Sequence, residues 1–147
     1  MELLRDAPRS TSRVLLVEDD AFSLKLMRDV LMARGYRIAE ATNGRDGLEL
    51  AVSVAPDLIV MDVGLPGMDG VEVTRRLKSD EATARIPVLA VTAYAMPGDE
   101  DRMRAAGCDE FLTKPLSFAQ FVTIVDFLCG GSVSRPFDQS SASGREK

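Results

Sequence analysis

The segment LIVMDVGLPGMDG, residues 58–70, contains the pattern that decides the fold. Four consecutive apolar residues lead directly into Asp62, and a short run that is apolar at every position is typical of a strand buried on both faces. A turn rich in glycine and proline follows, and Asp69 with Glu72 forms the D-x-x-E pattern that marks a helix start. The segment therefore predicts a strand, a turn and a helix, with a carboxylate at the end of the strand.

The same alternation of an apolar run and a helical segment occurs five times along the chain. The predicted strands are Val14 to Val17, Tyr36 to Ala41, Leu58 to Met61, Val88 to Val91, and a weaker run at Phe111 and Leu112. Alternating strands and helices indicate an α/β protein whose parallel sheet is covered by helices on both faces. We expect a doubly wound, flavodoxin-like fold with five helices and five parallel strands in the common order 2-1-3-4-5.

The predicted helices differ in how firmly they should be held. The first has Phe22, Leu26 and Val30 at spacing four, with Leu24, Met27 and Leu31 beside them. We expect these residues to anchor it, and Gly35 to end it with a left-handed cap. The fifth should begin at Ser117, in an S-x-x-Q pattern. The fourth, from Pro97 to Ala106, is mostly charged, which makes it a candidate moving part.

Length and composition suit one compact domain of 147 residues, 46% of them apolar. We expect a polar disordered arm at residues 1–12, a domain at residues 13–129, and a flexible tail at residues 130–147 that holds no output domain. The net charge of −5 disfavours nucleic acid and anionic membranes as partners, and no apolar run is long enough to span a bilayer. Cys108 and Cys129 form no CxxC pair, which suits a reducing cytoplasm. We expect a soluble cytoplasmic monomer.

Polar residues follow the predicted strands where their carboxyl ends meet. They are Glu18, Asp19 and Asp20 after the first strand, Asp62 after the third, Thr92 after the fourth and Lys114 after the fifth. In an open doubly wound sheet, ligands bind beyond the carboxyl ends of the strands, where the strand order reverses. The order 2-1-3-4-5 would therefore bring Glu18, Asp19 and Asp62 into one crevice beside Thr92 and Lys114. Asp20 is better explained as the N-cap of the first helix.

Three carboxylates in one crevice repel one another, so they must protonate, pair with cations or bind a metal. An oxygen-only ligand set favours a hard cation, and a few carboxylates completed by water and phosphate suit Mg²⁺. Carboxylates can also accept a phosphoryl group covalently. The chain contains no histidine, which excludes histidine-based acid–base catalysis and a Ser-His-Asp triad. The expected cofactor is therefore Mg²⁺, and the expected chemistry is phosphoryl transfer to Asp62.

The combination of EDD at residues 18–20, MDVGLPGMDG at 61–70, TA at 92–93 and KP at 114–115 resembles bacterial two-component response-regulator receiver domains. The resemblance covers roughly residues 13–129. Residues 92–115, TAYAMPGDEDRMRAAGCDEFLTKP, look most like single-domain cell-cycle regulators of the DivK type, although receivers of hybrid kinases share parts of this stretch.

The resemblance implies a role for each site residue. Asp62 would be the phosphoacceptor, and the Mg²⁺ ligands would be Asp19, Asp62 and the backbone carbonyl of Gly64, with Glu18 acting through water. Thr92 would hydrogen-bond a phosphoryl oxygen, Lys114 would pair with the phosphoryl group, and Thr92 and Phe111 would be switch residues. Members of the family also have a cis Lys-Pro bond at this position. Phe111 can equally be a core residue. The family often has a side chain where this sequence has Gly64, which leaves the lifetime of the aspartyl phosphate open.

The resemblance implies a signalling switch rather than an enzyme with its own substrate. It would be phosphorylated by a histidine kinase or a histidine phosphotransfer protein, and would signal by binding a downstream protein. Allosteric regulation and phosphoryl shuttling both remain open. One alternative is a phosphohydrolase with an aspartate nucleophile, but such an enzyme usually has a second acid at the position of Gly64. Another is a flavodoxin-like cofactor binder, in which the acidic residues after the first strand would repel the flavin phosphate.

Overall fold

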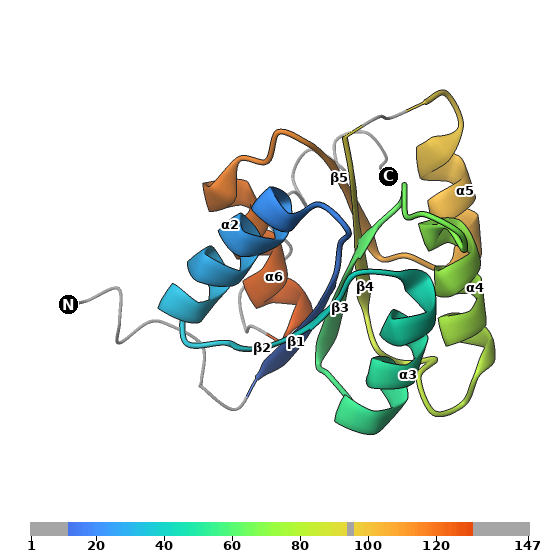
Figure 1. Cartoon of the computed structure of the whole chain (residues 1–147), viewed down its shortest axis with the longest axis horizontal. Coiled ribbons are helices and arrows are strands. Elements are labelled where there is room, and N and C mark those ends of the chain that lie inside the picture. The colour runs from blue at the N-terminus through green and yellow to red at the C-terminus, as the bar shows by residue number, and fades with distance from the viewer. Residues whose placement is uncertain (1–11, 94–95, 131–147) are drawn as a thin grey trace, which may run out of the picture.

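Five parallel strands form one sheet in the order β2-β1-β3-β4-β5, which confirms the predicted topology (Figure 1). The computed structural model describes residues 12–93 and 96–130, so most of the predicted arm and tail lies outside the described residues. The strands are β1 Arg13–Val17, β2 Arg37–Ala41, β3 Leu58–Asp62, β4 Val88–Thr92 and β5 Glu110–Thr113. The helices are α2 Ala21–Ala33, α3 Gly44–Val54, α4 Gly70–Ser79, α5 Asp99–Ala106 and α6 Phe118–Leu128.

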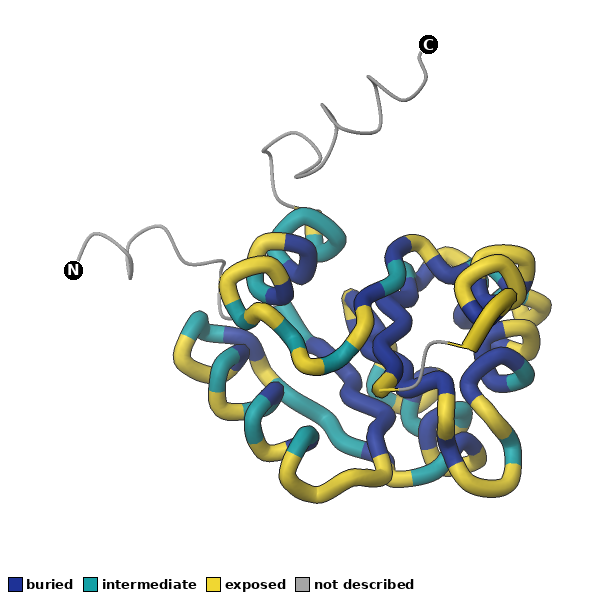
Figure 2. Tube along the Cα trace, turned by 90° about the horizontal axis from the view of Figure 1, so that it is seen from above, coloured by how far each residue is buried: buried dark blue, intermediate teal, exposed yellow. Residues whose placement is uncertain are grey.

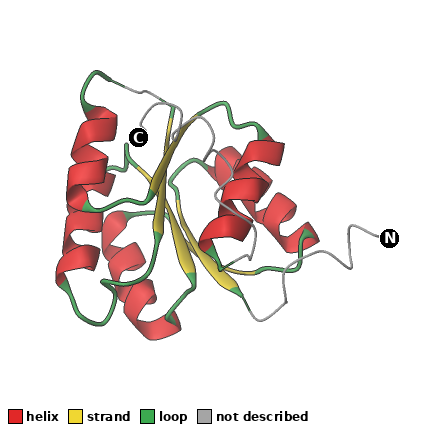
Figure 3. Ribbon diagram, turned by 180° about the vertical axis from the view of Figure 1, so that it is seen from behind, coloured by secondary structure: helices red, strands yellow, loops and turns green. Residues whose placement is uncertain are grey.

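The helices cover both faces of the sheet, with α2 and α6 on one side and α3, α4 and α5 on the other (Figures 1 and 3). Alternate residues of β1 point into two separate cores. Leu15 and Val17 belong to the core beneath α3, α4 and α5, whereas Val14 and Leu16 belong to the core beneath α2 and α6. A strand covered on both faces needs apolar residues at every position, which explains the continuous apolar runs in the sequence. Figure 2 shows the same arrangement, with the inner strands buried and the outer turns of the helices exposed.

Side-chain caps start four of the five described helices. Asp20 accepts a hydrogen bond from the Ser23 amide at 2.8 Å, as predicted for an N-cap, and Asn43 caps α3 in the same way. Asp69 and Ser117 cap α4 and α6 where the sequence patterns predicted helix starts. By contrast α5 begins at Gly98 without a side-chain cap, and it buries only Asp99, Met103 and Ala106. Pro97 lies outside this helix, so α5 is shorter than predicted.

Two expectations about the sheet and the first helix are wrong in detail. Phe22 does not anchor α2, because it is 69% exposed, and the buried residues of that helix are Leu24, Met27 and Leu31. Strand β2 is not fully buried, because it lies at one edge of the sheet. A helix buries only about one face against a sheet. The sequence of α2 has two apolar stripes, one with Phe22 and one with Leu24, and their spacing does not show which of them faces the sheet.

Four of the strands extend slightly beyond the predicted runs, whereas β2 begins one residue later than predicted, at Arg37. Asp62 and Thr92 are the last residues of β3 and β4, whereas Glu18 and Lys114 follow β1 and β5. Both cysteines are free thiols, with Cys108 buried and Cys129 half-buried. No helix in the described part of the chain is long and apolar enough to cross a membrane.

Candidate functional site

The structure brings together the three carboxylates that the sequence predicted to converge. One carboxylate oxygen each from Glu18, Asp19 and Asp62 lies within 4.8 Å of the other two. The cluster forms because β1 and β3 are neighbours and run parallel, with Val17 opposite Met61, so the residues that end the two strands lie side by side. Glu18 and Asp62 are buried, whereas Asp19 is exposed. The cluster therefore has a buried base and an edge open to solvent.

Asp62 lies in an environment that opposes its ionisation. Asp62 is only 6% exposed to solvent. This burial, together with the nearby charge of Glu18, raises the pKa of Asp62 to about 6. The amide of Gly64 donates a hydrogen bond to Asp62 Oδ1 at 3.0 Å, which acts in the opposite direction. A cation at this place would favour the ionised carboxylate, which is the form able to act as a nucleophile.

Lys114 pairs with Glu18 in this structure. Its Nζ lies 2.7 Å from Glu18 Oε1, and its side chain is 16% exposed beside a carboxylate that is 1% exposed. The second oxygen of Glu18 accepts a hydrogen bond from the Asp20 amide. The Lys114–Pro115 peptide bond is cis, as the family resemblance implies. One lysine beside three carboxylates leaves the cluster with excess negative charge.

Thr92 completes the line of polar residues at this edge of the sheet. It is 3% exposed, and its carbonyl accepts a hydrogen bond from the Lys114 amide at 2.8 Å. Asp62 is paired with Val91 in the sheet register, so Thr92 lies one residue beyond the position opposite Asp62. Polar residues in or directly after β1, β3, β4 and β5 thus gather at the carboxyl ends of these strands.

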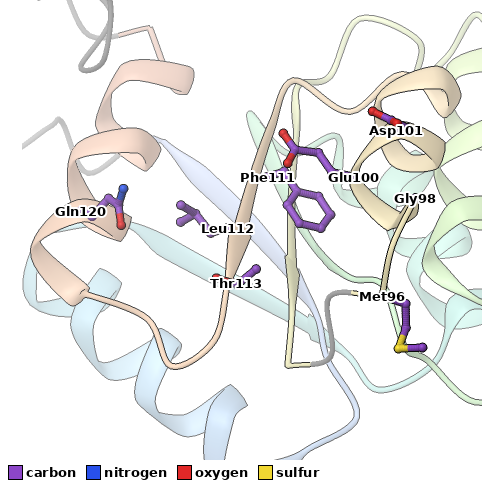
Figure 4. A pocket seen from close by; sticks show the side chains of 8 residues that line it. All are labelled: Met96, Gly98, Glu100, Asp101, Phe111, Leu112, Thr113 and Gln120. Atoms are coloured by element: carbon purple, nitrogen blue, oxygen red, sulfur yellow. The ribbon is translucent and has the colours of Figure 1, made fainter. Parts of the chain in front are cut away.

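Phe111 lies away from this cluster, on β5. It is half-buried and packs against the core on the α3, α4 and α5 side, while its neighbour Leu112 belongs to the opposite core. Phe111 borders a surface hollow of about 610 Å³ that is also lined by Met96, Glu100 and Gln120. Figure 4 shows the Phe111 ring together with the other side chains that line this hollow. The position of Phe111 is compatible with a core residue and with a switch residue, since it contacts the core and borders a hollow.

Ser23 was not recognised as a site residue from the sequence. Its Oγ lies 3.5 Å from Lys114 Nζ, because the Asp20 cap places the first turn of α2 beside the β5–α6 loop. The N-cap pattern at Asp20 predicted where α2 begins, but the position of Lys114 relative to that turn depends on strands far apart in sequence.

The carboxylate cluster fits a hard divalent cation. Its three ligand residues offer only oxygen atoms, and the described residues that approach them include no cysteine. Such a donor set suits Mg²⁺, which binds proteins through one or two carboxylates and keeps several water molecules. The solvent-exposed position of Asp19 leaves room for those waters.

The fold and this site together define the class of protein. A family model described as the response regulator receiver domain matches residues 14–126, and the chain belongs to this family. The doubly wound sheet and the carboxylates at its carboxyl edge agree with that assignment. The chain therefore has the phosphoacceptor signalling role of this family, in a two-component system.

Individual relatives define the type more closely. The chain is 46% identical over 119 residues to the polar-differentiation response regulator DivK of Brucella ovis, covering 80% of this chain and 97% of that one. Identity to DivK of Brucella anthropi is 47% over 116 residues, covering 78% of this chain and 94% of the relative. The predicted resemblance to DivK-type regulators is confirmed.

Solved structures show the same fold. The receiver domain of a sensor histidine kinase from Pseudomonas aeruginosa, with a magnesium ion coordinated in its active-site cleft, has a TM-score of 0.76 and 32% identity, covering 82% of this chain and 98% of that chain. Chemotaxis protein CheY4 of Vibrio cholerae has a TM-score of 0.75 and 25% identity, covering 80% of this chain and 98% of that chain.

Proposed function

We propose that Asp62 is the phosphoacceptor of this receiver and that Glu18, Asp19 and Asp62 bind Mg²⁺ beside it. The observation that carries the proposal is the convergence of these three carboxylates within 4.8 Å at the carboxyl edge of β1 and β3. Asp62 is central because it ends the middle strand, where the Gly64 amide orients one of its oxygens. The magnesium ion reported for the Pseudomonas aeruginosa receiver supports the choice of metal.

The transfer step needs an ionised carboxylate and compensation for phosphoryl charge. An oxygen of Asp62 attacks the phosphorus atom of the donor, the bond from phosphorus to the donor atom breaks, and the donor keeps that electron pair. A bound Mg²⁺ would supply positive charge that offsets the phosphoryl oxygens and favours the ionised form of Asp62. Asp19 and the Gly64 carbonyl would hold the ion directly, and Glu18 would hold it through water.

Lys114 and Thr92 are the residues that would bind the new phosphoryl group. Lys114 has to leave Glu18 to do so, and both groups lie at the same edge of the sheet. The exchange of one anionic partner for another provides two states of the site. Thr92 and Phe111 would transmit the change to the surface formed by α5, β5 and α6, beside the hollow that Phe111 borders.

The donor would be a phosphorylated histidine of a kinase or of a histidine phosphotransfer protein, and the output would be altered affinity for a downstream protein. We propose a monomeric cytoplasmic receiver formed by residues 13–129, with no turnover of an external substrate. Transfer from phosphorylated Asp62 to a purified phosphotransfer protein would identify a shuttle. A change in kinase activity without such transfer would identify an allosteric regulator.

Intact-mass measurement after incubation with acetyl phosphate tests the assignment directly. We expect one acid-labile phosphoryl group to be added in the presence of Mg²⁺, and none in its absence or in Asp62→Asn. Asp69→Asn serves as the matched control, because Asp69 is an exposed carboxylate near the site that caps α4. Addition of phosphate to Asp62→Asn, or a folded wild-type protein that gains none, would falsify the assignment.

A further inference from the structure

The loop between β3 and α4, residues 63–69, is closed by Gly70, the first residue of α4. The Gly70 amide donates a hydrogen bond to the Val63 carbonyl at 2.9 Å, which joins the two ends of the loop. At the start of the same loop, the Gly64 amide contacts Asp62 Oδ1 at 3.0 Å. The start of α4 therefore lies directly against the backbone that carries Asp62.

Gly70 has no space for a side chain. A Cβ atom at this position would lie 2.4 Å from the Asp62 carbonyl oxygen and 2.8 Å from Val63 Cα. Ordinary contacts between such atoms begin near 3.4 Å, so the helix or the Asp62–Val63 peptide would have to move by about 1 Å. The obstacles are backbone atoms, which cannot rotate away as a side chain can. Gly70 does not have a positive φ, so close approach rather than backbone conformation requires the glycine.

The other glycines near this loop differ from Gly70. A Cβ on Gly44 would lie 2.6 Å from a methyl group of Val73 and 2.9 Å from the Met68 carbonyl oxygen, so that glycine is crowded by α4 and the loop but not by Asp62. A Cβ on Gly64 would meet only Asp62 Oδ1, at 4.0 Å, so that position has open space. Of these three glycines, only Gly70 is pressed against the Asp62 backbone itself.

We propose that Gly70 is a positioning residue for Asp62 and for the metal site. Its contact sets how closely α4 approaches the Asp62–Val63 peptide, and thereby fixes the Asp62 carboxylate relative to the Gly64 backbone. The inference rests on the proposed function, because it concerns the same carboxylate and the same Mg²⁺ site. Mg²⁺ demands nearly ideal octahedral geometry, so a displacement of about 1 Å in one ligand residue weakens its binding.

Isothermal titration calorimetry with MgCl₂ tests this role in Gly70→Ala. The matched control is Gly107→Ala, because Gly107 precedes β5 at the amino end of the strands, has a φ of +115°, and a Cβ there would lie 2.6 Å from Lys78 Cγ. Urea unfolding should show that both variants lose stability. We expect the Kd for Mg²⁺ to rise at least about tenfold in Gly70→Ala and less than about twofold in Gly107→Ala.

The results separate this inference from the proposed function. If the wild-type protein is phosphorylated on Asp62 but Gly70→Ala binds Mg²⁺ normally, or no more weakly than Gly107→Ala, only the role of Gly70 is overturned. If the wild-type protein binds Mg²⁺ with the expected dependence on Gly70 but gains no phosphoryl group, the proposed function fails instead. A wild-type protein that binds no Mg²⁺ overturns both.

Hydrogen exchange in the wild-type protein provides a test if Gly70→Ala does not fold. A ligand that needs the closed loop must stabilise that loop, so Mg²⁺ at about ten times its Kd should slow exchange of the Gly70 amide by about tenfold. The Gly107 amide, which is hydrogen-bonded to Met103 and Arg104 at the end of α5, should exchange at an unchanged rate. Equal rates for Gly70 with and without Mg²⁺ would contradict the proposal.

Discussion

Two polar clusters lie at opposite ends of the parallel strands, one at the carboxyl ends and one at the amino ends, and they differ in charge balance. At the carboxyl edge, Glu18, Asp19 and Asp62 share a small space with one lysine. At the amino edge, Asp126 of α6 accepts hydrogen bonds from Arg34 and from the Tyr36 hydroxyl. We call this second group, Arg34, Tyr36 and Asp126, the α2–α6 clasp.

The clasp is balanced, with one cation, one anion and one neutral hydroxyl. Burial and the Asp126 hydrogen bond raise the pKa of Tyr36 well above its usual range, so the hydroxyl stays neutral. In the carboxylate cluster the pKa of Asp62 is raised to about 6, because its charge is neither well solvated nor well paired. We therefore expect the clasp to stabilise the fold, and the carboxylate cluster to cost stability that a bound cation can recover.

The largest expected effect is that of Lys114→Ala. The change leaves Glu18 buried beside two other carboxylates without its cation, and we expect a loss of about 3 kcal/mol in unfolding free energy without Mg²⁺. Phosphorylation of Asp62 should remain possible but should no longer produce the conformational response. Urea unfolding, intact mass and two-dimensional NMR spectra with a phosphodonor would measure these effects.

The control is Lys25→Ala, which removes an exposed lysine paired with Asp29 and should cost less than about 0.5 kcal/mol. Normal switching in Lys114→Ala would contradict the prediction.

Asp126→Ala should break the clasp. The change removes the acceptor of both Arg34 and Tyr36, and Tyr36 is only 3% exposed. An unsatisfied buried hydroxyl and an unpaired guanidinium should together cost about 2 kcal/mol, because Asp126 itself is partly exposed to solvent. Thr123→Ala, an exposed change on the same helix, is the control and should shift stability by less than about 0.5 kcal/mol. Equal urea midpoints for the two variants would show that the clasp contributes nothing.

Asp62→Asn should raise stability by between about 1 and 2 kcal/mol at pH 7.5 in EDTA. Because the pKa of Asp62 is raised from 3.8 to about 6 in the folded state, the folded protein binds this proton more tightly than the unfolded chain does. The contribution of Asp62 to wild-type stability is therefore lost as pH rises from about 4 to 6, and this loss is complete above that range. The gain from Asp62→Asn should be smaller at pH 5 than at pH 7.5. Urea unfolding at both pH values would show it, and a gain that grows as pH falls would disprove it.

Thr74→Val should have the smallest effect, a gain of about 1 kcal/mol. Thr74 of α4 is fully buried, and its hydroxyl has no hydrogen-bond partner among the described residues. Replacing the hydroxyl by a methyl group removes the cost of burying an unsatisfied polar group. Thr123→Val is the control, because the Thr123 hydroxyl is exposed and bonds the Ala119 carbonyl at 2.8 Å. A loss of stability in Thr74→Val, measured by thermal unfolding, would show that the hydroxyl has a partner in solution.

Local patterns in the sequence predicted the strands, the helix starts at Asp20, Asp69 and Ser117, and the residues of the carboxylate cluster. The apolar run Leu58 to Met61 predicted a strand covered on both faces, and the D-x-x-E pattern at Asp69 predicted a helix start. The structure confirms both, with the Glu72 amide donating to Asp69. The strand order 2-1-3-4-5, expected for a doubly wound sheet of five strands, places Glu18, Asp19 and Asp62 together. These predictions succeeded because each depends on near neighbours in the chain or on a general rule of parallel sheets.

The tertiary structure alone decided how the elements meet. Three features depend on segments far apart in sequence. They are the choice of the apolar stripe of α2 that faces inward, the pairing of Lys114 with Glu18, and the contact of Tyr36 with Asp126. The close approach of Gly70 to the Asp62 carbonyl is of the same kind, because a glycine in the sequence does not show which backbone lies against it. The sequence by itself determined which residues carry the charge, the order of strands and helices, and most of their boundaries. Only packing determined the distances between them, because those distances depend on how all the elements share one core.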